Sequence, residues 1–284
     1  MTRRISWALL AVLVLAQICY PLTTGATRAG LTVATVVIGW LLSVGHALLS
    51  RGPRVAAALI AVATGGGFAI EAIGVATGVP FGSYDYSGEL GPKLAGVPLI
   101  IPLAWTWMAW PAWLAAVRLT GGGSTAGGAG TTAGRWVGRI ALATVGLAAW
   151  DLFLDPQMVA EGYWVWRDAT PALPGLPGIP VSNYLGWLLF AVLMMSALRP
   201  LAGRAVAYTD RRDHPMVALY LWTYFSSILA HAVFLDLPAS ALWGAAGMSV
   251  TAVPLAVTLL RDRRSRAADR EDHEPRRAGV DATR

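Results

Sequence analysis

Long runs of apolar residues alternate with short polar segments along the whole chain. Each run has roughly 17 to 24 residues, which is enough to cross a hydrocarbon core of about 30 Å as a helix. We therefore predict an all-α fold, a polytopic transmembrane helix bundle of about eight helices. The predicted spans are residues 5–22, 31–49, 54–77, 97–118, 135–155, 181–199, 216–235 and 240–260.

Basic residues are unevenly distributed between the two sides that these spans define. The chain has 22 Lys and Arg against 16 Asp and Glu, a formal net charge of +6. With the N-terminus inside, every basic residue except Arg28, Lys93 and Arg167 lies on the cytoplasmic side. Because cytoplasmic loops are enriched in Lys and Arg, we predict an N-in/C-in, multi-pass protein of the cell (plasma) membrane. The charge reports topology, so nucleic acid is not an expected partner.

Two segments outside the spans are not expected to fold. Residues 120–134 are nearly all Gly, Ser, Thr and Ala, which is typical of a flexible cytoplasmic linker. Residues 261–284 alternate Arg with Asp and Glu without apolar periodicity, which predicts a disordered charged cytoplasmic tail. The chain is thus expected to form one transmembrane domain, residues 1–260, followed by this tail.

Polar side chains in four of the predicted spans lie at a similar depth. A carboxylate in hydrocarbon costs at least about 2.5–3.5 kcal/mol, so acids in spans usually face a bundle interior and mark a site. In the N-in orientation the polar groups all fall toward the outer face. They are Glu71, Asp151, Asp155, Asn183, His231 and Asp236.

Asp151 and Asp155 are one helical turn apart, with Cβ atoms within about 5–6 Å of each other. Two acids that close in a low dielectric do not both ionise easily. One is expected to hold a proton near neutral pH and to act as a general acid while its partner orients water. A simpler interpretation stays open, in which Asp155 before Pro156 ends the helix and Asp236 caps a turn.

Two histidines fall within predicted spans. His231 lies at the depth of the acids and can be a base, a metal ligand or a hydrogen-bonded packing residue, the last being the commonest role. His46 lies near the inner end of the second span and is expected at the membrane interface. We expect no metal site.

Tryptophans surround the acids in spans and loops. Trp107, Trp110 and Trp113 are three apart and form a stripe on one helix face, which could line a pocket for a long flat apolar ligand. Aromatic rings can also stabilise a passing cation. The alternative is an ordinary interfacial belt or packing.

Two outer loops have a similar pattern. Each contains an aromatic stretch, Phe81-Gly82-Ser83-Tyr84-Asp85-Tyr86 or Gly162-Tyr163-Trp164-Val165-Trp166. Each ends in a Gly-apolar-Pro step, Gly96-Val97-Pro98 or Gly178-Ile179-Pro180, that opens the next helix. An ancient duplication would explain why the two loops share this pattern.

These loops resemble the membrane-integral carotenoid biosynthesis family, together with Trp150-Asp151-Leu152-Phe153-Leu154-Asp155-Pro156 and Val181-Ser182-Asn183-Tyr184-Leu185-Gly186-Trp187. The family includes carotenoid 1,2-hydratases and bisanhydrobacterioruberin hydratase. The resemblance runs from roughly Glu71 to Asp236, and Leu176-Pro177 departs from it where an aromatic residue is expected. It implies an enzyme that adds water across the terminal C1–C2 double bond of a ψ-end carotenoid, without a cofactor.

Acid-catalysed hydration gives the polar residues definite roles. A neutral acid protonates C2, aromatic walls protect the tertiary cation at C1, and water captures it. We assign Asp151 as the acid, Asp155 or Glu71 as the partner that orients water, and Asn183 with Tyr84 as hydrogen-bonding support. The expected substrate-binding residues are Tyr86, Trp107, Trp110, Trp164, Trp187 and His231. The expected partners are an apolar carotenoid, the lipid bilayer and other carotenoid biosynthesis enzymes.

Two other function classes remain open. Asp151 and Asp155 are also spaced like one Asp-rich motif of a membrane prenyltransferase, which holds magnesium against a diphosphate. The other close pair, Asp210 and Asp213, falls on the cytoplasmic side and cannot share that metal. Alternatively, the chain is a non-catalytic carotenoid or lipid binder or transporter whose acids line a polar gate.

Overall fold

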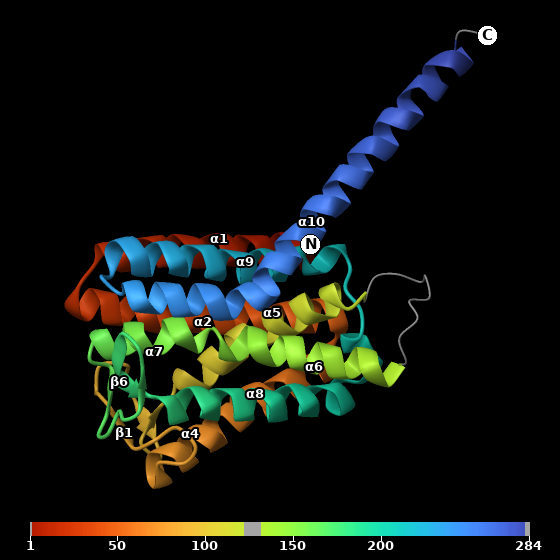
Figure 1. Cartoon of the computed structure of the whole chain (residues 1–284). Helices are drawn as coiled ribbons and strands as arrows, with labels where there is room; N and C mark the ends of the chain where they lie inside the picture. The colour runs from red at the N-terminus through yellow and green to blue at the C-terminus, as the bar shows by residue number, and fades with distance from the viewer. Residues whose placement is uncertain (1, 122–131, 282–284) are drawn as a thin grey trace.

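The computed structural model describes residues 2–121 and 132–281. Its helices lie side by side as rods of one bundle (Figure 1), which confirms the predicted all-α membrane architecture. Within the described residues, seven helical segments are long and apolar enough to cross a membrane. The helices are α1 (Thr2–Cys19), α2 (Gly25–Arg51), α3 (Pro53–Leu59), α4 (Gly66–Thr77), α5 (Ile101–Leu119), α6 (Thr132–Ala148), α7 (Asp151–Ala160), α8 (Val181–Ala202), α9 (His214–Leu229) and α10 (Pro238–Asp281).

Helix α5 is not among the seven apolar segments, yet it runs through the middle of the bundle. Nearly every residue from Ile101 to Val117 is buried. Because its neighbours shield it from lipid, α5 can carry Trp, Thr and Pro without facing hydrocarbon. Pro111 cannot donate to the carbonyl of Trp107, and the Ser43 hydroxyl of α2 donates to that carbonyl at 2.8 Å instead.

Several predicted spans are composite helices. A π-helical stretch, Ile60–Gly65, joins α3 to α4, and another, Ala230–Phe234, ends α9. The fifth predicted span consists of α6 and α7 with a break at residues 149–150, and it extends to Ala160. The interpretation that Asp155 ends its helix is therefore wrong, since α7 continues through Pro156.

The two ends of the bundle differ. The N-terminus, the chain ends that flank residues 122–131, and the point where α10 leaves the bundle lie at one end (Figure 1). N-in/C-in and N-out/C-out topologies both require this arrangement, and we call this end the inner end after the predicted N-in/C-in topology. Most of the predicted linker 120–134 lies outside the described residues. Helix α10 projects beyond the bundle to Asp281, whereas the sequence predicts disorder after residue 260. Continuing a formed helix avoids the nucleation cost, and Ala, Arg and Glu favour it.

Short strands occupy the loops at the other, outer end. β1 (Tyr84–Tyr86) pairs antiparallel with β4 (Trp164–Trp166), so the two similar loops bind each other. Each loop then forms a small hairpin before the next helix: β2 (Lys93–Leu94) with β3 (Val97–Pro98), and β5 (Ala172–Leu173) with β6 (Leu176–Pro180). The paired loops cover the outer end of the bundle.

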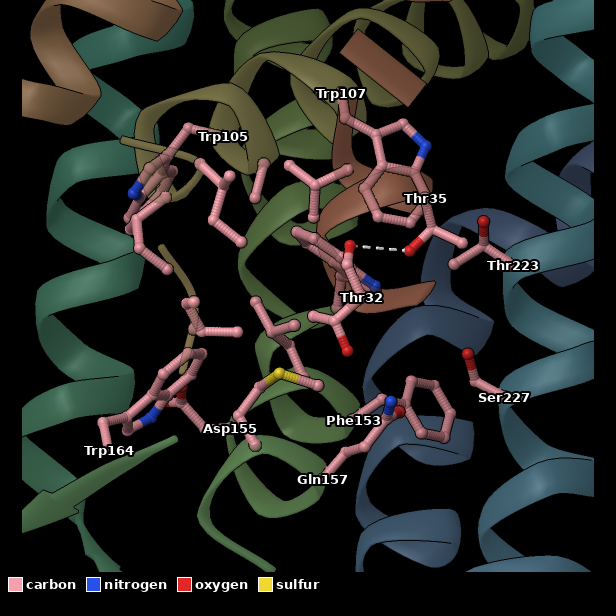
Figure 2. A pocket seen from close by; sticks show the side chains of 18 of the residues that line it. Thr32, Thr35, Trp105, Trp107, Phe153, Asp155, Gln157, Trp164, Thr223 and Ser227 are labelled. Carbon is pink, nitrogen blue, oxygen red and sulfur yellow. Dashed lines mark hydrogen bonds between the residues drawn. The ribbon is translucent and has the colours of Figure 1, made fainter. Parts of the chain in front are cut away.

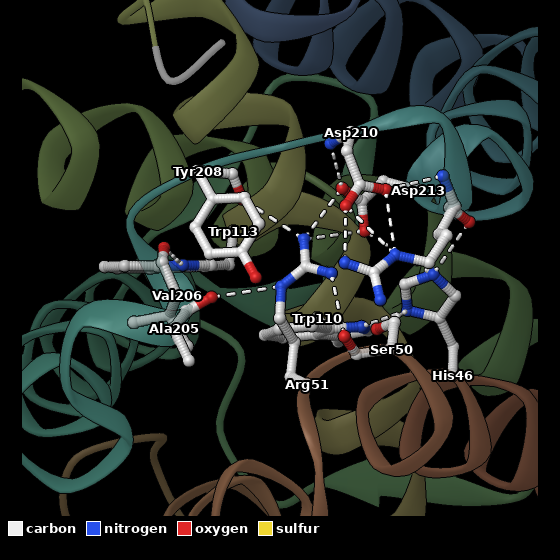
Figure 3. Close-up of polar contacts among 11 residues, drawn as sticks. His46, Ser50, Arg51, Trp110, Trp113, Ala205, Val206, Tyr208, Asp210 and Asp213 are labelled. Carbon is white, nitrogen blue, oxygen red and sulfur yellow. Dashed lines mark hydrogen bonds and ion pairs between the residues drawn. The ribbon is translucent and has the colours of Figure 1, made fainter.

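A buried polar cluster, the inner clasp, joins α2, α5 and the segment before α9 (Figure 3). Arg51 donates to both carboxylate oxygens of Asp213 at 2.8 and 2.9 Å. His46 accepts from Trp110 Nε1 at 2.9 Å and lies 3.0 Å from the Arg212 carbonyl oxygen. His46 is buried within this cluster, near the inner end of α2, and its depth at the membrane interface stays a prediction. The cluster satisfies polar groups that would otherwise be stranded in the bundle.

We predict that Asp213→Asn lowers the free energy of unfolding by about 3–5 kcal/mol, because it leaves the Arg51 guanidinium buried beside a neutral partner. Thermal and denaturant unfolding in detergent measures the change. Asp85→Asn is the matched control, since Arg167 also donates to both carboxylate oxygens of Asp85, through Nε and Nη2, but in solvent. Equal effects of the two substitutions would contradict a stabilising role for the clasp.

Candidate functional site

An internal cavity of about 140 Å³ lies at the outer end of the bundle, beneath β1 and β4 (Figure 2). Side chains from α2, α4, α5, α7, α8 and α9 line it. An engineered apolar cavity of about 150 Å³ accepts benzene, so this cavity can hold one end of a hydrocarbon chain of similar bulk. A longer molecule would have to extend out of it.

One side of the cavity is aromatic. Trp105 of α5 stacks on Trp187 of α8 with ring centroids 3.7 Å apart, and Trp107 meets Trp150 edge-on at 5.5 Å. In Figure 2, Trp105 and Trp164 lie on the side opposite Thr223 and Ser227. The aromatic residues lining the cavity are Phe81, Tyr84, Tyr86, Trp105, Trp107, Trp150, Phe153, Trp164, Trp166, Trp187 and Tyr20.

The opposite side carries aliphatic hydroxyl groups. Thr32 and Thr35 of α2 donate to backbone carbonyls of their own helix, which leaves their oxygen lone pairs free to accept. Thr223, Ser226 and Ser227 of α9 have i, i+3, i+4 spacing and present a second row. The cavity therefore has one face suited to an apolar or cationic group and one suited to water.

The two aspartates of α7 are held together by one amide. Asn183 Nδ2 of α8 donates to Asp151 Oδ2 at 2.8 Å and also to Asp155 Oδ2. Asp155 lines the cavity, whereas Asp151 is fully buried behind it. Two carboxylates this close, with one neutral amide between them, would repel strongly, so the pair holds a proton in common.

Glu71 has a different environment, although it also lines the cavity. Its Oε2 accepts from the hydroxyls of Tyr84 at 2.7 Å and Tyr86 at 2.8 Å, and its Oε1 accepts from Trp105 Nε1 at 3.0 Å. An indole N–H can only donate, so this arrangement favours the carboxylate form. These three donors hold the Glu71 carboxyl group in place and tie it to β1 and α5.

The structure brings most of the predicted site residues to this cavity. The lining residues that the sequence analysis named are Glu71, Tyr84, Tyr86, Trp107, Asp155, Trp164, Asn183, Trp187 and His231. Asp151 lies directly behind them. Trp105, Phe153, Gln157 and the hydroxyls of α2 and α9 were missed as site residues, because uncharged side chains in a span resemble packing residues.

Trp110 and Asp236 do not reach the cavity. Three residues along a helix rotate a side chain by about 60° and move it about 4.5 Å, which carries Trp110 from the cavity at Trp107 to the clasp at His46. Asp236 is exposed in the left-handed region, at φ 54°, just after the π-helical end of α9. Its interpretation as a turn residue fits this position.

The sequence profile of the carotenoid biosynthesis protein family matches residues 30–253. The chain belongs to this family. The match includes the acid pair, Asn183, Glu71 and His231, and with the seven apolar helices it identifies a membrane protein of the carotenoid biosynthesis family.

The chain is also similar to bisanhydrobacterioruberin hydratase of Haloarcula japonica, with 38% identity over 123 residues. This alignment covers 43% of the chain and 37% of the hydratase, so the chain matches little more than a third of that relative's length. No solved structure matches the chain.

The hydrogen bonds of the carboxyl groups predict different responses to amide substitution. Glu71 accepts from three donors, and Glu71→Gln replaces one of its two carboxyl oxygens by an NH₂ group that cannot accept. At least one buried donor then lacks its acceptor, so the free energy of unfolding should fall by about 1–3 kcal/mol. Asp151→Asn should be milder, because an amide mimics the protonated member of the acid pair. Thermal unfolding of both variants in detergent checks the order, and a larger loss for Asp151→Asn would contradict the assigned protonation.

Proposed function

We propose that the protein is a carotenoid hydratase that adds water across the C1–C2 double bond of a ψ-end carotenoid. The observation that carries this proposal is the acid pair, two buried carboxyl groups that accept from one amide, of which Asp155 lines an aromatic cavity sized for one hydrocarbon end. Similarity to a bisanhydrobacterioruberin hydratase supports the same reaction class. Acid-catalysed hydration requires no redox or group-transfer agent, so the proposed enzyme is cofactor-independent.

Asp155 is the proposed proton donor, with Asp151 as the partner that shares its proton. The sequence alone favoured Asp151, but Asp155 is the member of the pair that lines the cavity. The Asp155 carboxyl O–H protonates C2, the π electrons form the new C–H bond, and a tertiary cation remains at C1. Asn183 holds the carboxyl groups in register during this transfer. A neutral acid held in a low dielectric is well matched to a weakly basic alkene.

The aromatic walls suit the proposed cation. Trp105, Trp187 and Trp107 present ring faces and edges to the cavity, and a cation over an indole face gains about 0.5–2 kcal/mol. Glu71, held by three donors, lines the same cavity. The rings also exclude bulk water, so capture is left to a water molecule on the hydroxyl-lined side.

The substrate in this proposal is an apolar carotenoid dissolved in the lipid bilayer of the plasma membrane. Its polyene is far longer than the cavity, so one end enters while the rest extends into lipid. Lateral access from the membrane follows from that length, and handover from other carotenoid biosynthesis enzymes is the matching expectation.

A magnesium-dependent prenyltransferase is not favoured by the arrangement of the acids. Asp213 precedes α9 and His231 follows it, so the 16 residues of α9 separate the two regions by about 24 Å. Asp213 and Asp210 are also occupied by Arg51 and Arg212. A single metal-bound diphosphate cannot span that distance.

We predict that Asp155→Asn abolishes product formation while the protein still accumulates in the membrane. General acid catalysis typically contributes about 10²–10⁴-fold, so hydroxylated carotenoid should fall by at least about 10²-fold. Pigment analysis of a lycopene- or γ-carotene-producing host that expresses each variant measures this. Asp151→Asn should also lose product, because it removes the shared proton.

Asp236→Asn is the control for that experiment, since Asp236 is an exposed carboxylate at the same end of the bundle. It should leave the pigments unchanged. Wild-type yields of hydroxylated carotenoid from Asp155→Asn would remove the acid pair from the mechanism. If the wild-type protein binds carotenoids of the host but never hydrates them, the result would favour a binder or transporter.

A further inference from the structure

His231 lies in the π-helical end of α9, is 1% exposed and lines the cavity. Its ring meets Phe153 edge-on at 5.2 Å, which fixes the plane of the imidazole. The proton transfer from Asp155 does not use this side chain. For a buried histidine, the hydrogen-bond partners of the two ring nitrogens determine which nitrogen carries the proton.

The proton on Nδ1 of His231 is fixed by a chain of contacts that starts at Pro156. Because proline has no N–H, the carbonyl of Leu152 one turn earlier has no helical partner. The Ser240 hydroxyl of α10 donates to that carbonyl at 2.7 Å. Having spent its proton there, Ser240 can only accept from His231 Nδ1, which lies 2.9 Å away.

With the Nδ1 position protonated, Nε2 of the neutral ring keeps a free lone pair. Nε2 lies 3.2 Å from the side-chain amide oxygen of Gln157, which also lines the cavity. A primary amide serves both states of the ring, because its oxygen accepts from an imidazolium Nε2–H and its rotated NH₂ donates to a neutral Nε2. Gln157 therefore lets His231 gain and lose a proton without stranding a polar atom.

The surroundings of this pair combine hydroxyl groups with the ring of Phe153. Gln157 lies toward Ser227 on the hydroxyl-bearing side, whereas Asp155 lies on the side of Trp164 (Figure 2). The α9 face that carries Thr223, Ser226 and Ser227 leads along the same helix to His231. An acid and a potential base thus border one cavity from its two chemically different sides.

We infer that His231 is the general base that takes the proton from the attacking water, an inference that rests on the proposed hydration. After Asp155 has protonated C2, a lone pair of a water oxygen forms the bond to C1, and one O–H bond of that water breaks with its electrons left on oxygen. The released proton goes to His231 Nε2, while Nδ1–H continues to donate to the Ser240 hydroxyl oxygen. Transfer of that proton through water back to the carboxylate of Asp155 restores both groups, so one turnover consumes only substrate and H₂O.

Deuterium exchange separates the two proton transfers. In D₂O, deuteration of C2 can reverse by loss of the original proton from C2, which restores the C1–C2 double bond, so recovered substrate gains deuterium even when water is not captured. For His231→Gln in detergent with a ψ-end carotenoid, we expect hydrate to fall at least about 10²-fold while deuterium still enters recovered substrate. Asp155→Asn should lose both signals. Mass spectrometry of product and recovered substrate measures them.

Rescue experiments guard against a folding defect in the substituted protein. Added imidazole should restore hydration to His231→Ala, and Ser240→Ala should lose a smaller part of hydration because only the ring tautomer is freed. His214→Gln, a histidine replacement at the other end of α9, should behave as wild type. Wild-type hydration by His231→Gln, or loss of exchange together with hydration and no imidazole rescue, would overturn the inference. A wild type with neither hydrate nor exchange would instead refute the proposed function.

Discussion

The contact on which the site depends is the single amide of Asn183 shared between two buried carboxyl groups. An acid in a membrane interior is tolerated only when its polar atoms are satisfied or a proton neutralises it. Asn183 supplies N–H donors to Asp151 and Asp155 but no positive charge, so the pair must keep a proton. Glu71, which lines the same cavity, accepts from three donors. Two kinds of carboxyl group thus coexist at one cavity because their donors differ.

Proline positions much of the remaining machinery. Pro111 leaves the carbonyl of Trp107 to Ser43, which ties α5 to α2 beside the cavity. Pro156 leaves the carbonyl of Leu152 to Ser240, which ties α7 to α10 and orients His231. In hydrocarbon such a carbonyl needs a donor, and for Pro111 and Pro156 that donor is a serine hydroxyl of a neighbouring helix. At both prolines, the hydroxyl that satisfies the freed carbonyl also fixes how the neighbouring helix is placed.

The sequence predicted the bundle well because hydropathy and residue depth are local properties. It located Glu71, Asp155 and Asn183 at one end without any knowledge of helix packing, and the family resemblance is confirmed by the match over residues 30–253. It favoured Asp151 as the acid and could not show that Asp155 is the one that lines the cavity, since the direction that faces the cavity depends on how α7 is rotated against α8. Trp110 was misassigned for the same reason. Helical spacing gives a stripe, but only packing decides where along the stripe a cavity ends.

The pairing of distant polar groups was beyond sequence reasoning altogether. Nothing in the local pattern links His46 to Trp110 or Ser240 to Leu152, because those bonds join helices far apart in the chain. The inner clasp and the hydrogen bonds that link Leu152, Ser240, His231 and Gln157 are nevertheless made of ordinary residues at helix ends and bends. Their significance comes from burial, which turns each unmet hydrogen bond into a penalty of about 1–3 kcal/mol.

The most direct test of the central claim follows the oxygen atom. Purified protein in detergent is given a carotenoid with a free ψ end in ¹⁸O-labelled water, and the pigment is analysed by mass spectrometry. Proton-initiated hydration at the cavity predicts a product that has gained one water carrying the labelled oxygen. Substrate recovered unchanged, or a hydroxyl group without the label, would contradict it.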